Sequence, residues 1–224
     1  MKVKSREEVR SVEREPVTIS AGPAQIDGDL TLPERAKGLI IFAHGSGSSR
    51  HSPRNQFVAG TLHELGFGTV LLDLLSPEEE ARDEFSGRWR FDIRLLAERL
   101  EYATQWAHAN EELRDLPKGY FGSSTGAAAA LVAAAEEREE VRAVVSRGGR
   151  PDLAGEALRH VMAPTLLIVG GHDESVITLN EEAAQWMTCE KDLVIVPGAT
   201  HLFAEPGALD HVARLAGRWF LEYL

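Results

Sequence analysis

The stretch from residue 118 to residue 137 constrains the fold of this chain most. An aromatic and apolar run ends at Phe121, and G-S-S-T-G follows before an alanine-rich segment. This is a G-x-S-x-G sequence between an expected strand and an expected helix. Gly122 and Gly126 leave room for strained backbone at Ser124 and for close helix packing. The turn would expose the Ser124 hydroxyl at a helix N-terminus, where free N–H groups favour negative charge. In the alternative interpretation, Ser124 only caps the helix.

Length and charge limit the classes of protein to which the chain can belong. Its 224 residues suit one α/β domain spanning 1–224, with residues 1–15 partly frayed. The excess of 35 acidic over 24 basic residues argues against nucleic acid or anionic membrane as a partner. A lone Cys189 excludes an internal disulfide or a CxxC metal knuckle, and we expect no metal and no cofactor. With no apolar span or signal-peptide core, a cytoplasmic location is the simplest expectation.

Apolar runs alternate with segments of helical periodicity along the chain. Besides the strand before Ser124, the runs predict strands at 16–21, 25–32, 39–43, 68–72, 141–146, 164–169 and 192–196. Helices are predicted after Ser124 and at 53–65, 92–107, 152–161, 178–187 and 208–224, whereas the charged segment 76–91 is interpreted as a loop. The alternation predicts an α/β protein whose mostly parallel sheet is covered on both faces.

Polar residues directly follow two of the later predicted strands. Asp173 comes after 164–169, and His201 comes after 192–196. Because loops at the carboxyl ends of parallel strands share one edge of the sheet, both can meet Ser124. A serine hydroxyl needs a base such as His201, and the imidazole needs a carboxylate such as Asp173 to orient it. Glu174 is the weaker alternative for the carboxylate.

An acyl-transfer site also needs two N–H donors for the developing oxyanion. We expect one from Thr125, the residue after the serine, and the other from Ser46 in the small-residue loop 44–49, with Gly47 as the alternative. A glycine-rich loop before a helix can instead hold phosphate. No G-x-x-x-x-G-K-[ST] or G-x-G-x-x-G pattern stands in the required context here.

Together these motifs resemble the α/β-hydrolase superfamily, and the short chain resembles its dienelactone hydrolase-like branch. The matching motifs are His44-Gly45-x-Gly47, Gly122-x-Ser124-x-Gly126, Gly171-x-Asp173 and Gly198-Ala199-Thr200-His201. The resemblance implies a three-layer α/β-hydrolase fold with no large cap domain, because only 147–163 separates the two strands between which a cap is commonly inserted. Dienelactone hydrolases proper use a cysteine nucleophile, and this chain has Ser124. The resemblance therefore implies serine esterase chemistry and leaves dienelactone doubtful as the substrate.

Substrate contacts are the least constrained of the expectations. The missing cap implies an open, shallow site. The segment 76–91 either folds over this site as a small lid or is a solvated connection. Arginines 50, 54, 147 and 150 flank strand ends, where they attract an acidic substrate or pair with the chain's own carboxylates. The candidate substrate contacts are Gly47, Arg50, Arg147 and Trp89. Asp73, also at a strand end, is expected to hold the neighbouring loop by hydrogen bonds.

These inferences predict a serine hydrolase that cleaves small-molecule carboxylic esters through Ser124, His201 and Asp173. A thioesterase or an acyltransferase would use the same residues, because the sequence does not distinguish water from another acyl acceptor. A catalytically silent α/β-hydrolase fold that binds a ligand or a protein is the alternative from another class. The oligomeric state is left open.

Overall fold

The computed structural model describes residues 13–224, and its centre is an eight-stranded sheet in the order β1-β2-β4-β3-β5-β6-β7-β8. The strands are β1 Arg14–Ala21, β2 Ala24–Thr31, β3 Leu39–Ala43, β4 Gly68–Leu72, β5 Lys118–Ser123, β6 Val141–Arg147, β7 Thr165–Gly170 and β8 Lys191–Val196. β1 and β2 form an antiparallel hairpin, β2 runs antiparallel to β4, and all the other neighbours are parallel. The mostly parallel sheet is therefore confirmed.

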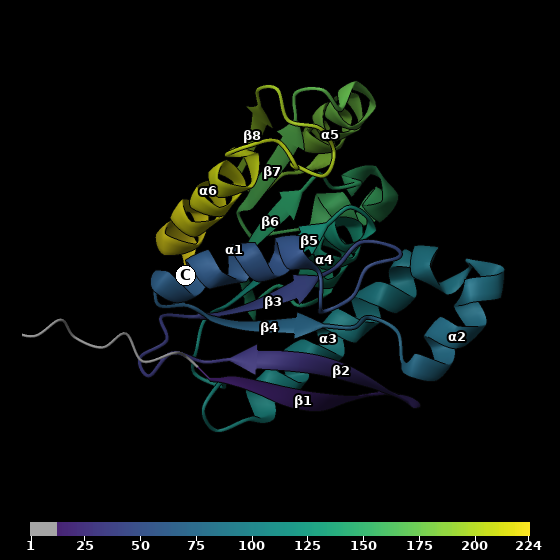
Figure 1. Ribbon diagram of the computed structural model, residues 1–224, viewed down its shortest axis with the longest axis vertical. Helices are drawn as coiled ribbons and strands as arrows, with labels where there is room; N and C mark the ends of the chain where they lie inside the picture. Colours follow the sequence, from purple (N-terminus) through teal and green to yellow (C-terminus); the bar gives the residue numbers. More distant parts are fainter. Residues whose placement is uncertain (1–12) are drawn as a thin grey trace, which may run out of the picture.

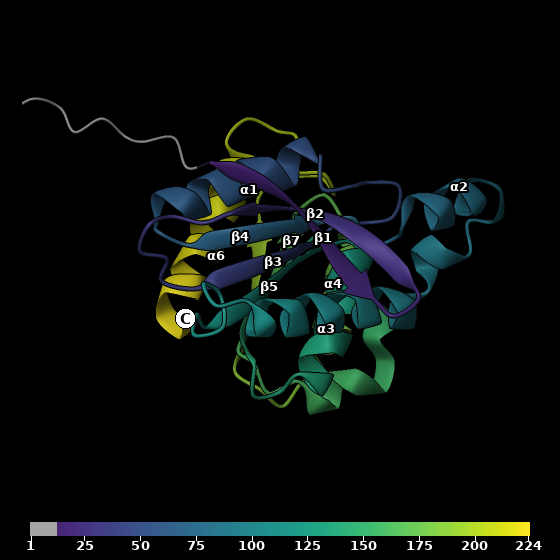
Figure 2. The ribbon, with the colours of Figure 1, turned by 90° about the horizontal axis from the view of Figure 1, so that it is seen from below.

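Helices cover both faces of this sheet and make three layers. α1 Pro53–Glu64 and α6 Ala208–Tyr223 lie on one face, while α3 Ile93–Ala109, α4 Thr125–Glu136 and α5 Glu174–Trp186 lie on the other (Figures 1 and 2). Each interface has its own apolar core, and every residue of β3, β5 and β7 is buried. The continuous apolar runs in the sequence thus mark strands that are covered on both faces.

Most predicted elements lie within a few residues of the observed ones. The bounds of β3 and β4 agree with the prediction at both ends, and Asp92 caps α3 by accepting a hydrogen bond from the Leu95 N–H, at 3.1 Å. Residues 1–12, part of the segment expected to fray, lie outside the described residues. Arg14 and Glu15 belong to β1 instead of to a frayed end, because they pair with Thr31 and Leu30.

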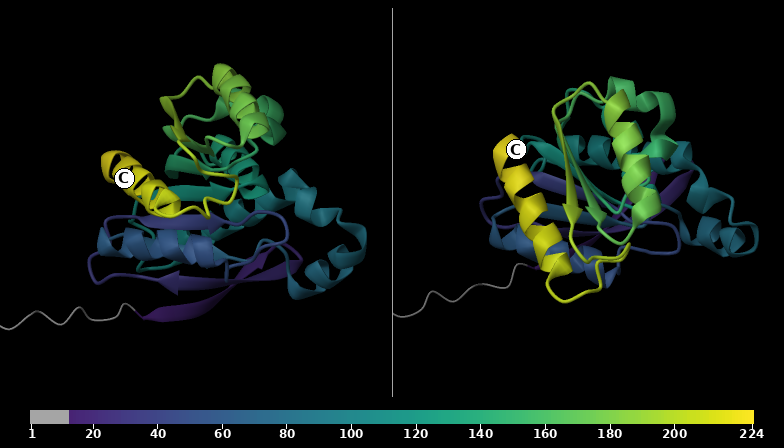
Figure 3. Two further views of the ribbon diagram at one scale, coloured as in Figure 1. Left: turned by 45° about the horizontal axis from the view of Figure 1, so that its top comes forward. Right: turned by 90° about the horizontal axis from the view of Figure 1, so that it is seen from above.

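The interpretation of 76–91 as a loop is wrong. The structure has α2 at Pro77–Ser86 and a short 3₁₀ helix, η1, at Trp89–Phe91. Ser76 and Glu79 form a reciprocal capping box at the start of α2, and Gly87 ends the helix with a φ of 60°. These start and stop signals are present in the sequence, and they outweigh the high charge of the segment. α2 lies beyond the carboxyl ends of β3 and β4, at the side of the molecule (Figures 1 and 3).

Two further predictions need correction, one between β6 and β7 and one directly after β7. The helix expected at 152–161 is a 3₁₀ segment, η2 Pro151–His160, which breaks at Gly155 with a φ of 53°. α5 begins at Glu174, four residues earlier than Thr178, and Asp173 occupies its N-cap position. The connection from β6 to β7 holds only this short segment, so no large cap covers the carboxyl edge of the sheet there. Within residues 13–224 no helix combines the length and the apolar character needed to cross a membrane.

Candidate active site

Ser124 occupies a strained turn between β5 and α4. Its φ of 51° and ψ of −122° are rare for a residue with a side chain and cost about 1–3 kcal/mol. Glycine is required on both sides of this turn, because a side chain at either position would collide with neighbouring backbone. A Cβ at Gly122 would lie 2.4 Å from the Ala127 Cα, and one at Gly126 would lie 2.4 Å from the Ala43 carbonyl oxygen. The sharp turn expected from the G-x-S-x-G sequence is confirmed.

The loops after β7 and β8 bring Asp173 and His201 together. The Nδ1–H of His201 donates to Oδ2 of Asp173 across 2.6 Å. Because an ionised carboxylate only accepts hydrogen bonds, this contact selects the tautomer of the neutral imidazole that has its proton on Nδ1 and its lone pair on Nε2. Asp173 is mostly buried at 13% side-chain exposure, whereas His201 is 39% exposed and faces solvent on one side. Glu174, the weaker alternative for the carboxylate, lies exposed in the first turn of α5, and His172 is also exposed.

Ser124 and His201 line the same cavity, whose volume is about 250 Å³. The wall also includes Ser46, Ser48 and Arg147. Among residues 13–224 no hydrogen bond joins the Ser124 hydroxyl to the His201 imidazole. Catalytic hydrogen bonds are often long in a free enzyme and shorten in the complex with substrate, so shared access to one cavity is the informative feature.

The two residues expected to donate to an oxyanion contact each other directly. The Ser46 N–H donates to the Thr125 hydroxyl across 2.9 Å. The Thr125 N–H lies in the first turn of α4, where backbone N–H groups lack an acceptor within the helix. Ser46 and Gly47 form the centre of a turn closed by the Ser48 N–H on the Gly45 carbonyl at 3.1 Å, and Gly47 has a φ of 71°. The structure thus places the Ser46 N–H beside Thr125, but with a side-chain hydroxyl already bound to it.

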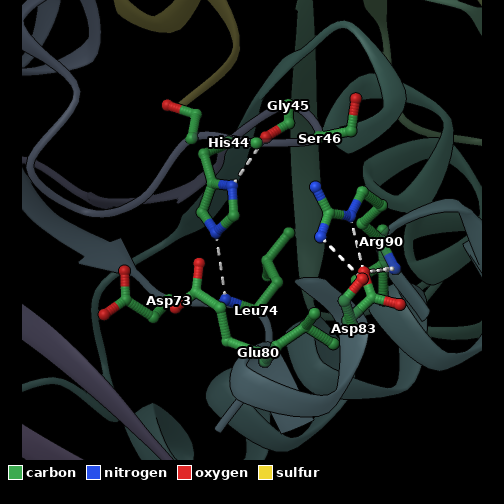
Figure 4. A pocket seen from close by; sticks show the side chains of 12 residues that line it. His44, Gly45, Ser46, Asp73, Leu74, Glu80, Asp83 and Arg90 are labelled. Carbon is green, nitrogen blue, oxygen red and sulfur yellow. Dashed lines mark hydrogen bonds and ion pairs between the residues drawn. The ribbon is translucent and has the colours of Figure 1, made fainter. Parts of the chain in front are cut away.

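His44 and Asp73 hold this loop in place, and the role of His44 was not predicted from the sequence. Figure 4 shows the His44 ring between the Gly45 carbonyl and the Leu74 backbone. The Leu74 N–H donates to Nε2 at 3.1 Å, so Nδ1 carries the proton and donates to the Gly45 carbonyl at 2.9 Å. Burial lowers the pKa of His44, which keeps the ring neutral as both bonds require. The signals in the sequence are its position directly after β3 and its place in the His44-Gly45-x-Gly47 motif.

Asp73 fixes the other end of the loop, as expected. Its Oδ1 accepts the Arg50 N–H at 2.7 Å, and its Oδ2 pairs with the Arg50 guanidinium. The same guanidinium lies 3.6 Å from Asp29 and 3.8 Å from Asp27. Arg50 is therefore occupied by the chain's own carboxylates, and it does not line the cavity of Ser124.

The remaining candidate substrate contacts do not share one cavity. Gly47 lines a small cavity of about 30 Å³ behind the loop, which is the view of Figure 4. Trp89 belongs to η1 and lies outside the cavity of Ser124; its N–H donates to Asp83 at 2.6 Å. Arg147, the last residue of β6, does line the cavity of Ser124, and Arg54 of α1 lies in the same wall. Burial, and then the charge of Arg54, lower the pKa of Arg147 to about 10.

No metal site accompanies these residues in the part of the chain that the structure describes. Among residues 13–224 no group of three or more His, Cys, Asp and Glu side chains is arranged to hold an ion. The described residues bring to the site a serine hydroxyl, an imidazole–carboxylate pair and backbone N–H groups.

Comparisons with known proteins show the fold and the family of this chain. A crystal structure of a dienelactone hydrolase from Anabaena variabilis is 56% identical, with a TM-score of 0.93, and the match covers 95% of this chain and 98% of the other. Est1E from Butyrivibrio proteoclasticus shares the fold at 16% identity, with a TM-score of 0.77 over 92% of this chain and 98% of its own.

Two curated proteins of Mycobacterium tuberculosis also match, each named "Putative phosphoribosyl transferase". They are 56% identical over 210 residues, which is 94% of this chain but 46% of their own length. The chain thus spans about half the length of these relatives. The model of the family described as "Dienelactone hydrolase family" matches residues 26–219. The chain belongs to the dienelactone hydrolase family of α/β hydrolases.

Proposed function

We propose that this hydrolase cleaves carboxylic esters through a Ser124–His201–Asp173 triad and an acyl-enzyme intermediate. One observation carries the proposal: a serine on a strained turn between strand and helix opens into the cavity that is lined by His201, which is hydrogen-bonded to Asp173. Strain at an exposed nucleophile is what such a site requires, because the turn lifts the hydroxyl out of the backbone. Serine stands where dienelactone hydrolases proper have cysteine, so an ester is the proposed substrate class instead of dienelactone.

In the proposed reaction, Asp173 holds His201 in the tautomer whose free Nε2 faces the cavity. Nε2 takes the proton of the Ser124 hydroxyl as its oxygen attacks the ester carbonyl. The oxyanion then accepts the N–H of Thr125 and replaces the Thr125 hydroxyl as the acceptor of the Ser46 N–H. His201 passes the proton to the departing alcohol, and water, activated by the same imidazole, releases the acid. General-base help of this kind contributes roughly 10²–10⁴-fold in rate.

The transferase name of the curated relatives is not part of this proposal. Those proteins are about twice as long as the part that matches, and the family model places the matching part in a hydrolase family. We therefore assign ester hydrolysis to this chain and no phosphoribosyl transfer.

Active-site labelling tests the identity of the nucleophile. A fluorophosphonate probe should label the wild type on the peptide that contains Ser124, as located by mass spectrometry. Labelling should disappear in Ser124→Ala and persist in Ser123→Ala. Ser123 is a matched control, because this neighbouring serine is buried and donates its hydroxyl to Asn55 at 3.0 Å. Labelling that persists in Ser124→Ala would remove the proposed nucleophile.

Turnover of p-nitrophenyl acetate separates the enzyme from a silent binding protein. Ser124→Ala should lower kcat by roughly 10³-fold or more, because the members of such a triad act as a unit. Equal rates for wild type and variant would favour the non-catalytic alternative. The same assay with a thioester, and with an added alcohol as acceptor, distinguishes esterase from thioesterase and hydrolysis from acyl transfer.

An open site is part of the same proposal. Without a large cap, the rate should vary smoothly across acyl chain lengths of uncharged aryl esters. A sharp preference for a single bulky uncharged ester would contradict this part of the proposal and would imply that another element, such as α2, closes over the cavity.

A further inference from the structure

Two arginines without an acidic partner line the cavity of Ser124. Arg147 is 7% exposed, and neither its Nε nor its Nη1 has a hydrogen-bond partner. The Nε of Arg54, in the first turn of α1, is also buried without a partner. Within residues 13–224 no carboxylate lies within 4.0 Å of either guanidinium. The two cations therefore face a cavity that supplies no anion of its own.

The other arginines near the carboxyl ends of the strands are paired. Arg50 contacts Asp73, Arg90 contacts Asp83 at 2.6 Å, and Arg150 contacts Asp152 at 2.7 Å. The chain has 35 acidic and 24 basic residues, so acidic partners are abundant. Burying a charge without a partner costs several kcal/mol, which applies to Arg147 more than to the half-buried Arg54, and an entering anion would offset this cost. The unpaired state of Arg147 and Arg54 thus points to a ligand.

The surroundings of the two arginines fix their position and supply further donors. The Arg147 guanidinium carbon lies 6.0 Å from the centre of the Phe203 ring, which borders the His201 loop. The N-terminus of α1 begins at the same wall, with Ser52 as its N-cap. Ser46, Ser48 and Ser52 are among the residues that line the cavity, and Leu202 is the one large apolar residue in that lining. This lining suits an oxygen-rich group better than an alkyl chain.

We propose that Arg54 and Arg147 form a subsite for a phosphate group, so that the enzyme selects esters whose acyl or alcohol part carries a phosphate. Two guanidinium groups match a dianion, and the polar serine lining and the N-terminus of α1 match a group with three accepting oxygens. A carboxylate has one charge and two oxygens, so it would leave part of this donor set unmatched. The preference for phosphorylated esters depends on the proposed esterase function, but the subsite itself does not.

Binding of inorganic phosphate tests the subsite without catalysis. In calorimetric titrations at constant ionic strength, Ser124→Ala should bind phosphate. Adding Arg147→Met or Arg54→Gln should weaken that binding at least tenfold, and adding Arg147→Lys should weaken it less than Arg147→Met. Arg150→Gln is the matched control, because its side chain is paired with Asp152 and lies outside the cavity. Equal phosphate affinity in all variants, or an adventitious ion that binds elsewhere, would overturn the subsite.

Substrate selection is tested with three p-nitrophenyl esters of equal chain length that end in a methyl, a carboxylate or a phosphonate group. The phosphonate ester should have a kcat/KM at least tenfold above that of the neutral ester, and Arg147→Met or Arg54→Gln should remove the difference. A carboxylate ester that is used as well as or better than the phosphonate ester would overturn the assignment to phosphate. Equal use of all three would overturn the subsite.

Two readouts separate this inference from misfolding and from failure of the proposed function. Replacing a buried unpaired charge by Met should leave Tm unchanged or raise it by roughly 2–4 °C, whereas loss of a structural arginine would lower it. Arg54→Gln keeps the test open if Arg147→Met does not fold. If Ser124→Ala hydrolyses p-nitrophenyl acetate like the wild type, the esterase proposal fails, but phosphate binding still reports on the arginines.

Discussion

At the scale of single residues, the site depends on side chains that hold backbone in place. The Thr125 hydroxyl accepts the Ser46 N–H at 2.9 Å, and His44 fixes Gly45 from the other side of the same loop. Both residues act on the loop that is proposed to donate to the oxyanion. The free enzyme thus keeps the Ser46 N–H satisfied until an oxyanion replaces the hydroxyl.

Thr125→Val tests this contact with an almost unchanged shape. Loss of this hydrogen bond should lower the free energy of unfolding by about 0.5–1.5 kcal/mol, because Ser46 is exposed and water can reach its N–H. Urea denaturation followed by circular dichroism measures the change. The turnover of p-nitrophenyl acetate should survive, because the two backbone donors remain. A loss as large as that of Ser124→Ala would mean that the Thr125 hydroxyl itself takes part in the reaction.

At the scale of elements, α2 and η1 are held by one buried carboxylate. Burial acts to raise the pKa of Asp83, but bonds from Arg90 and from the N–H groups of Trp89 and Arg90 outweigh it and hold the pKa at about 2. The start of α2 is tied to the body by Glu79, which pairs with Arg99 of α3 at 2.6 Å. Outside these ties the segment has few apolar contacts, and Phe85 is 93% exposed.

Asp83→Asn should loosen this segment and leave the sheet intact. The amide keeps the shape but loses the charge that Arg90 and the backbone N–H groups require. Hydrogen exchange followed by mass spectrometry should be faster in residues 77–91 and unchanged in β5 and α4. Glu84→Gln is the matched control, because Glu84 lies exposed on the same helix. Equal exchange in the two variants would show that Asp83 does not hold the turn.

At the scale of the whole molecule, two partly buried histidines link stability to pH. Burial lowers the pKa of His44 and of His63 below the usual 6.5. The unfolded chain therefore binds more protons than the folded protein as the pH falls below 6.5. The stability that these neutral rings contribute is present above pH 6.5 and is lost as the pH falls through their lowered values.

The free energy of unfolding should thus fall between pH 7 and pH 5. In His63→Gln the fall should be smaller, because one of the two buried imidazoles is gone. His51→Gln changes an exposed histidine and serves as the control. Urea denaturation at each pH measures the slope. A slope that is identical in wild type and His63→Gln would exclude His63 as a source of the effect.

The sequence predicted the scaffold of the site well because the signals are local. Continuous apolar runs mark β3 and β4, and G-x-S-x-G predicts the strained turn that the structure has at Ser124. The capping box and C-terminal glycine of α2 are also local signals, but the high charge of the segment favours a loop and conceals them. The break at Gly155 leaves no trace in the periodicity, because an apolar repeat does not show where the chain leaves the helix.

By itself, the sequence determined the chain order of Ser124, Asp173 and His201 and placed each on the loop after a strand. Periodicity and turn chemistry act over a few residues, so the sequence alone predicts the structures that depend on them. Only the tertiary structure decided that Arg50 is held by Asp73 while Arg147 and Arg54 remain unpaired in the cavity of Ser124. Charge pairing depends on distances through space between residues that are far apart in the chain, and no local pattern records those distances.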